Sequence, residues 1–157
     1  MNVNTKEVLV IDDQYSIRTS IKFVLDKDYT VHQAENVKTG LSIIEEQLID
    51  VVILDLSLEG ISGIDGLKMI KDLDRCLSVI ILTGYGSLKT AQQAIRYKAS
   101  DYLIKPFNTE KLRESVERCS NETVEMRTMQ KLNECHKRLF NVQNLKKIEG
   151  LKTVQYG

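Results

Sequence analysis

Short, wholly apolar runs recur along the chain, and each is followed by polar residues. Four of them lie at residues 8–11, 51–54, 79–82 and 102–104. They are rich in β-branched side chains and do not alternate with polar residues, which is typical of strands buried on both faces of a parallel sheet. A fifth strand is predicted at 29–34. The pattern therefore predicts a five-stranded parallel sheet.

Between these runs, apolar residues follow the helical period. The predicted helices carry them at Ile17, Ile21, Val24 and Leu25; at Val37, Leu41, Ile44 and Leu48; at Leu67, Met69, Ile70 and Leu73; at Leu88, Ala91, Ala94 and Ile95; and at Leu112 and Val116. Ser87 is the expected N-cap of the fourth helix. Alternating βα units of this length predict a doubly wound α/β fold with right-handed crossovers, in flavodoxin-like strand order.

Polar residues that could bind ligands or take part in catalysis follow four of the predicted strands. Asp12 and Asp13 follow the first strand, Asp55 the third, Thr83 the fourth and Lys105 the fifth. The carboxyl ends of parallel strands share one edge of the sheet, where open α/β folds place their ligand crevice. We therefore expect these side chains to converge.

Their chemistry suits phosphoryl transfer. Carboxylates such as Asp12, Asp13 and Asp55 are hard ligands for Mg²⁺, which we expect as the cofactor. A carboxylate beside Mg²⁺ can attack phosphorus and form an aspartyl-phosphate. Lys105 would neutralise one phosphoryl oxygen and Thr83 would donate a hydrogen bond to another.

At these motifs the chain resembles the receiver domains of two-component response regulators. The resemblance covers residues 6–120, and its motifs are closest to the receivers of AAA+ enhancer-binding transcription activators. It rests on Asp12-Asp13, Asp55-Leu56-Ser57-Leu58 with Gly63, Leu82-Thr83-Gly84, and Asp101-Tyr102-Leu103-Ile104-Lys105-Pro106-Phe107.

The resemblance implies a role for each site residue. Asp55 would receive a phosphoryl group from a sensor histidine kinase or a phosphotransfer protein. Mg²⁺ would be bound by Asp13, Asp55 and the backbone carbonyl of Ser57, with Asp12 acting mostly through metal-bound water. Lys105 would contact the phosphoryl group.

The resemblance also implies a switch. Thr83 and Tyr102 would form the switch pair, and the peptide bond between Lys105 and Pro106 would be cis. Phosphorylation would change the surface made by the fourth helix, the fifth strand and the fifth helix. That surface, or the C-terminal helix, would support a homodimer.

The chain departs from the usual receiver pattern at three positions. Glu59 stands where the family usually has Pro, Ser62 where Asp is frequent, and Lys98 where Gly usually ends the fourth helix. A side chain at a left-handed position would cost about 1 kcal/mol or more. These departures leave the reacting groups intact.

Length and charge indicate one domain with an appendage. We expect a receiver at 1–121 and a helical tail or linker at 122–157. Residues 1–120 carry 15 basic and 18 acidic side chains, and 121–157 carry seven basic and four acidic ones. The apolar spacing of the tail breaks near Gln130, which leaves open a short coiled coil, packing on the receiver, or a solvated helix. A net charge of +3 on so short a tail gives little support for nucleic-acid binding.

The remaining composition points to a cytoplasmic protein with no membrane contact. Apolar runs of four or five residues are far shorter than the ~20 needed to span a bilayer. Cys76, Cys119 and Cys135 lack paired metal-ligand spacing and are expected to be idle thiols.

Two other functions are alternatives to the receiver. A flavodoxin-like binding domain would need a phosphate loop after the first strand, where Asp12 and Asp13 would repel a phosphate. An aspartyl-phosphate phosphatase would need an acid two residues after Asp55, where Ser57 stands. The signalling receiver is preferred, as a self-phosphorylating and self-dephosphorylating switch and not as a metabolic enzyme.

Overall fold

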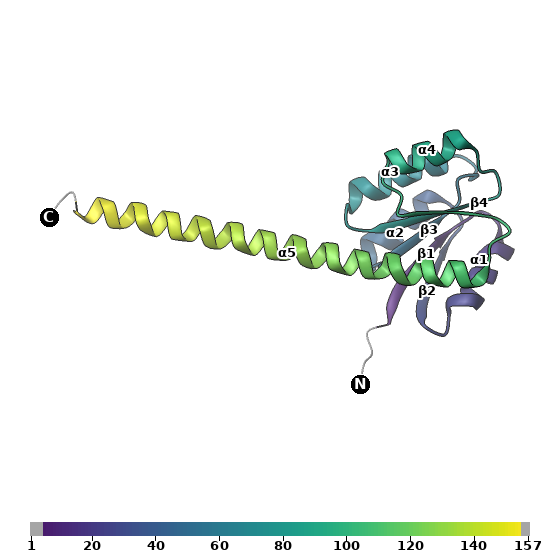
Figure 1. Ribbon diagram of the computed structural model, residues 1–157, viewed down its shortest axis with the longest axis horizontal. Helices are drawn as coiled ribbons and strands as arrows, with labels where there is room; N and C mark the ends of the chain where they lie inside the picture. The colour runs from purple at the N-terminus through teal and green to yellow at the C-terminus, as the bar shows by residue number, and fades with distance from the viewer. Residues whose placement is uncertain (1–4, 155–157) are drawn as a thin grey trace. The chain divides into compact units, whose positions relative to one another are not determined.

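The computed structural model describes the backbone of residues 5–154 and the side chains of residues 5–147. Strands and helices alternate strictly along the chain (Figure 1). Their bounds are β1 Lys6–Ile11, α1 Tyr15–Leu25, β2 Tyr29–Ala34, α2 Val37–Glu46, β3 Val51–Leu54, α3 Gly63–Leu73, β4 Ser78–Thr83, α4 Leu88–Arg96, β5 Asp101–Ile104 and α5 Thr109–Val154. The five strands form one parallel sheet in the order β2-β1-β3-β4-β5. The predicted fold and its flavodoxin-like strand order are confirmed.

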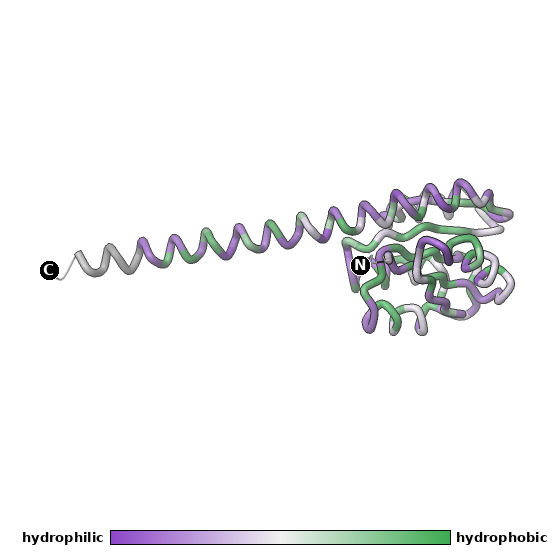
Figure 2. The backbone as a smooth tube through the Cα atoms, turned by 90° about the horizontal axis from the view of Figure 1, so that it is seen from below, coloured by the Kyte–Doolittle hydropathy of each residue, from purple (hydrophilic) through white to green (hydrophobic). Residues whose placement is uncertain are grey.

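The sheet separates two hydrophobic clusters, because successive strand residues point to opposite faces. One cluster joins the sheet to α1 and α5 through Val10, Ile53 and Leu82 of the strands and Ile21, Leu25, Leu112 and Val116 of the helices. The other joins it to α3 and α4 through Ile11, Leu54 and Ile81 of the strands and Leu67, Ile70 and Ala94 of the helices. Hydrophobic (green) and hydrophilic (purple) stretches alternate along the tube in Figure 2. Burial on both faces explains why the sequences of β1, β3 and β4 contain continuous apolar runs.

Local hydrogen bonds set the helix starts. The Ser87 side chain accepts from the Thr90 amide at 3.1 Å and Thr90 accepts from the Ser87 amide at 2.9 Å, so the predicted N-cap of α4 is part of a reciprocal capping box. α1 begins at Tyr15, after Gln14, without a side-chain cap. The Asp13 carboxylate does not serve as the cap of α1, and it is exposed at the sheet edge.

Several apolar residues of the predicted helices lie on the surface. Leu48 falls beyond the end of α2 and is 71% exposed, and Leu88 and Ile95 of α4 are 77% and 75% exposed. Met69 and Leu73 of α3 are also exposed. The helical period alone therefore did not identify the core residues, because α4 buries only Ala94 fully and α3 buries a narrow stripe around Leu67 and Ile70.

Lys98 has a backbone φ of 62°, in the left-handed region. It follows α4, where the Lys98 amide donates to the Ile95 carbonyl and the Ala99 amide to the Ala94 carbonyl. Glycine is favoured at such a helix end, because a Cβ there costs about 1 kcal/mol or more. The expected strain at Lys98 is therefore present.

The chain divides into two compact units, Met1–Val124 and Glu125–Gly157. The division falls three residues after the boundary expected at 121/122, and α5 belongs to both units. In the second unit, the side chains of 125–147 are exposed except that of Arg127, which is half-buried. The role of this unit as a tail or linker stays a prediction. Among the helices within 5–154, none has the length and apolarity that crossing a membrane requires.

Candidate functional site

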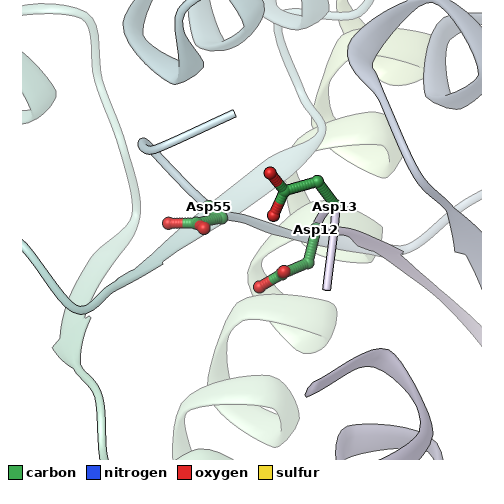
Figure 3. Close-up of side chains that lie close together, drawn as sticks. All are labelled: Asp12, Asp13 and Asp55. Atoms are coloured by element: carbon green, nitrogen blue, oxygen red, sulfur yellow. The ribbon is translucent and has the colours of Figure 1, made fainter. Parts of the chain in front are cut away.

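Three carboxylates meet at the carboxyl edge of the sheet (Figure 3). Asp12 and Asp13 follow β1 and Asp55 follows β3, and these strands are paired, with Ile11 beside Leu54. One oxygen from each carboxylate lies within 4.8 Å of the others. Asp12 and Asp55 are buried and Asp13 is exposed. The predicted convergence of the three acids is present in the structure.

Lys105 brings a positive charge from the end of β5. Its Nζ lies 2.6 Å from Asp12 Oδ2 and 3.2 Å from Asp55 Oδ2. The Lys105 amide donates to the Thr83 carbonyl at 3.0 Å, and the peptide bond to Pro106 is cis, as expected. The loop after β5 thus holds the ammonium between the two buried carboxylates.

Burial and pairing act in opposite directions on this ion pair. Burial raises the pKa of Asp12, and the hydrogen bonds from Lys105 and the Gln14 amide offset this only in part. Burial alone would lower the pKa of Lys105, but its bonds to Asp12 and the charge of Asp55 raise it above the ordinary value. Lys105 therefore stays charged and stabilises the two buried acids.

The expected switch residues come from the paired strands β4 and β5, where Thr83 pairs with Ile104 and Tyr102 pairs with Ile81. Thr83 is buried, and its Oγ1 accepts from the Tyr85 amide at 3.3 Å. The Tyr102 hydroxyl lies 3.1 Å from Thr90 Oγ1 of α4. A Cβ at Gly86 would lie 3.0 Å from this hydroxyl, so the glycine leaves room for the tyrosine. Tyr102 thus contacts α4 directly.

The loop after β3 is also fixed close to the site. The Ser57 amide donates to Asp55 Oδ1 at 3.2 Å. A side chain at Gly63 would collide with the Asp55 carbonyl and with Leu56, so a glycine is required where α3 begins. The role of the Ser57 carbonyl as a metal ligand stays a prediction.

Arg18 is a site residue that the sequence reasoning missed. Its guanidinium donates to the backbone carbonyls of Asp12, at 2.7 Å, and Asp13, at 3.2 Å. It thereby holds the loop between β1 and α1. Its position on the first turn of α1 is that of any surface arginine on a helix, so the sequence carried no signal of this role.

The donor set suits a divalent cation. Three carboxylates against one ammonium leave two negative charges, and carboxylate oxygens are the ligands that Mg²⁺ prefers. The repulsion among the acids would be relieved by such an ion. The structure thus defines a doubly wound α/β protein with an acidic cluster, a lysine and a hydroxyl at one sheet edge.

The chain belongs to the response regulator receiver domain family, which residues 8–117 match. Sporulation initiation phosphotransferase F of Bacillus subtilis (strain 168) is 35% identical over 114 residues, which are 72% of this chain and 92% of that protein. Transcriptional regulatory protein ZraR of Escherichia coli (strain K12) is 35% identical over 118 residues, which are 74% of this chain but 27% of that protein.

Solved structures agree with this assignment. A crystal structure of a response regulator receiver domain protein from Clostridium thermocellum has a TM-score of 0.72 and 37% identity, and the match covers 77% of this chain and 98% of that one. The family assignment favours the signalling receiver over the flavodoxin-like and phosphatase alternatives. The chain spans most of the first relative and about a quarter (27%) of the second, so only its receiver part is comparable with the latter.

Proposed function

We propose that Asp55 accepts a phosphoryl group from a phosphohistidine of a sensor histidine kinase or a phosphotransfer protein. The observation that carries this proposal is the placement of Lys105 Nζ 3.2 Å from a buried Asp55 carboxylate that also lies beside Asp12 and Asp13. In the reaction, an Asp55 oxygen forms a bond to phosphorus while the bond from phosphorus to the donor nitrogen breaks. The electron pair of that bond leaves with the histidine.

The residues around Asp55 would orient and neutralise the reacting groups. Asp55 Oδ1 accepts from the Ser57 amide, which fixes the carboxylate for attack. The Lys105 ammonium is close enough to Oδ2 to contact a phosphoryl oxygen attached there. Thr83 would donate its hydroxyl to another phosphoryl oxygen once it is released from the Tyr85 amide.

Mg²⁺ would be held by the carboxylates of Asp12, Asp13 and Asp55 and the carbonyl of Ser57, with Asp12 acting mostly through water. When bound, the ion supplies positive charge to the phosphoryl oxygens, which is the main catalytic requirement of phosphoryl transfer. The exposure of Asp13 leaves this side of the cluster accessible to ion and donor.

The output is proposed to be a change of the α4-β5-α5 surface. Thr83 accepts from the Tyr85 amide in the loop before α4, and Tyr102 contacts Thr90 of α4, so movement of the Thr83 hydroxyl toward phosphate would free space for the tyrosine ring. A bistable element of this kind needs only a differential stabilisation of a few kcal/mol. This surface, or the helix beyond Val124, would then pair with a second copy.

The name of the Escherichia coli relative favours an output in transcription regulation, and that of the Bacillus relative favours a phosphorelay. The chain itself would act in the cytoplasm as a switch that phosphorylates and dephosphorylates itself, without a metabolic substrate. Protein partners, and neither nucleic acid nor membrane, would be its direct contacts.

Incubation with acetyl phosphate and Mg²⁺ tests the phosphoacceptor. Intact mass should increase by one phosphoryl group, which hydroxylamine should remove. Asp55→Asn should abolish the gain, and Asp65→Asn, an exposed aspartate on α3, should not. A hydroxylamine-labile phosphate on Asp55→Asn at the wild-type rate would disprove the assignment.

Beryllofluoride, a phosphate mimic, tests the switch. It should shift the amide resonances of residues 84–104 in the wild type and increase self-association in sedimentation. Thr83→Ala should blunt both effects while Asp55 still accepts phosphate. Equal responses in the two proteins would exclude Thr83 as a switch residue.

A further inference from the structure

A cavity lined mainly by charged residues lies between α3 and the C-terminal end of α4. It has a volume of about 340 Å³ and is lined by Lys68, Lys71, Asp72, Arg96, Tyr97 and Lys98. Four of these six side chains are cationic, and Asp72 is the one carboxylate among them. The first unit as a whole is acidic, so this concentration of positive charge is local.

This basic groove is at the sheet edge opposite to Asp55. Lys71 Nζ donates to the carbonyl of Leu77, the residue directly before β4, at 2.6 Å. Lys98 lies three residues before β5. Both residues are thus near the amino ends of strands whose carboxyl ends carry Thr83 and Lys105. A ligand in the groove would not compete with the phosphoacceptor.

The cations differ in how far they are neutralised. Lys68 Nζ lies 2.9 Å from Asp65 Oδ1 and 4.5 Å from the centre of the Tyr97 ring. Lys71 donates to a neutral carbonyl and retains two further N–H groups. Burial lowers the pKa of Lys71; the charge of Asp74 opposes this effect, and the charge of Lys98 adds to it. An anion placed between Lys71 and Lys98 would relieve their repulsion.

The backbone of Lys98 is an independent observation. Within 5–154, Lys98 is the only non-glycine residue with a positive φ. Strained backbone persists where the surrounding structure enforces it, and such positions cluster at ligand sites and switch regions. The favourable position of cations at the C-terminus of α4 accounts for Arg96 and Lys98. It does not account for Lys68 and Lys71, which come from α3.

We propose that this basic groove binds a small anion that carries more than one phosphate group. Compact lysine ammonium groups bind phosphate as point charges, and the guanidinium of Arg96 can bind it through two parallel hydrogen bonds. The cations come from α3, from α4 and from Lys98, two residues after the end of α4, so they can contact separate phosphates of one ligand. The cavity volume is within the range of small-molecule sites, at roughly 300–1,000 Å³.

Calorimetric titration of the full chain with inorganic pyrophosphate, without Mg²⁺, tests the proposal. The wild type should bind one pyrophosphate, and Lys98→Gly should weaken binding by about tenfold or more, because one charge-assisted contact is lost. Lys98→Gly should also raise the unfolding temperature, because glycine accepts the positive φ. Loss of binding in a more stable protein cannot result from misfolding.

Two controls separate this groove from other charge effects. Lys22→Ala removes a lysine from the last turn of α1 and should leave pyrophosphate affinity unchanged. Asp55→Asn, which abolishes the proposed phosphoacceptor, should also leave it unchanged, so the two proposals can fail separately. Absence of saturable binding, or equal weakening by Lys22→Ala and Lys98→Gly, would overturn the proposal.

Vesicles with anionic phospholipid distinguish a lipid headgroup from a free ligand. The wild-type chain should not sediment with vesicles that contain phosphatidic acid while it binds pyrophosphate. Sedimentation with these vesicles together with failure to bind pyrophosphate would overturn the small-ligand proposal.

Discussion

Both units of the chain contain apolar side chains, but among the described side chains of residues 5–147 only the first unit buries them. In the first unit, strand residues such as Ile53 and Leu54 are at most 1% exposed. In the second unit, Leu132, Leu139 and Phe140 are 53%, 57% and 64% exposed. Residues 1–124 carry 15 basic and 19 acidic side chains, a net charge of −4, and 125–157 carry seven and three, a net charge of +4.

This difference shows what burial adds to a periodic pattern. A helix without tertiary contacts depends on intrinsic propensity and is marginal in water, whereas a packed element gains stability from each buried side chain. The first unit therefore specifies its own structure. The helix of the second unit must be stabilised either by a partner or by the helix propensity of its residues.

The largest expected effect compares one truncation in each unit. Ile53→Ala should lower the free energy of unfolding by about 2–5 kcal/mol, because it opens a cavity in the sheet core. Leu139→Ala should change it by no more than about 0.5 kcal/mol, because its side chain is exposed. Urea denaturation followed by circular dichroism measures both. A comparable loss for Leu139→Ala would show that the second unit is packed in solution.

The second prediction concerns the acidic site of the first unit. Asp13→Asn should raise the Mg²⁺ dissociation constant by about tenfold and slow phosphorylation, because a direct ligand is lost. Asp13 is exposed, so the stability of the fold should be unchanged. Calorimetric titration measures the affinity, with Asp26→Asn at the end of α1 as the matched control. Equal affinities in all three proteins would remove Asp13 from the ligand set.

The third prediction concerns the contact between β5 and the start of α5. Asp101 accepts from Ser115 Oγ at 2.6 Å and from Arg118 at 2.7 Å. Burial alone would raise the pKa of Asp101, but the Ser115 hydroxyl, the Tyr102 amide and Arg118 outweigh it, so this pKa lies below the ordinary value of 3.8. The stabilisation is therefore present above that value and is lost as the pH falls through the folded-state pKa.

Asp101→Asn should accordingly lower the free energy of unfolding by about 1 kcal/mol at neutral pH. The difference in unfolding free energy between this variant and the wild type should shrink as the pH approaches about 3, where the Asp101 carboxyl of the unfolded chain is mostly protonated. Urea denaturation across this pH range measures it. Glu122→Gln, which breaks a more exposed bond to Arg118, should have a smaller effect. A difference independent of pH would contradict the assignment to the Asp101 charge.

The smallest expected effect tests self-association of the second unit. Leu132, Cys135, Leu139 and Val142 have the spacing of two heptads. In a parallel pair, the two exposed Cys135 thiols would face each other, so mild oxidation should give a covalent dimer that Cys135→Ser abolishes. Cys119 should not react, because it is buried and its pKa is raised to about 11.

Salt sharpens this test. Lys131 and Arg138 lie next to the apolar residues that would pair, so like charges of two copies oppose dimer formation. Raising the ionic strength should therefore strengthen the dimer by a few tenths of a kcal/mol. Sedimentation equilibrium without oxidant measures the association. A chain that stays monomeric at every concentration and salt level would leave the second unit as a solvated helix.

The sequence predicted the sheet and the cluster of acids well for a shared reason. Parallel strands buried on both faces leave uninterrupted apolar runs, and chain direction alone then places Asp12, Asp55 and Lys105 at one edge. Helix faces were predicted less well. Ile95 has the helical spacing of a core residue, but burial depends on how α4 lies on the sheet, which periodicity does not determine.

Contacts that depend on side-chain direction were also missed. Arg18 reaches back to the carbonyls of Asp12 and Asp13, and nothing in its spacing distinguishes it from a solvated arginine. The basic groove likewise depends on how the ends of α3 and α4 approach each other. Long polar side chains in these places are fixed by tertiary structure alone.

The complete burial of β3 has a consequence for the lifetime of the site. Its four residues are at most 1% exposed, and the strand lies between β1 and β4. Amide protons in such a strand exchange with solvent only when the whole domain opens, whereas those of exposed loops exchange through local fluctuations. Asp55 is attached directly to this strand. Its place beside Asp12 is therefore lost only by global unfolding, and local fluctuations of the surrounding loops can admit ligands without dispersing the acids.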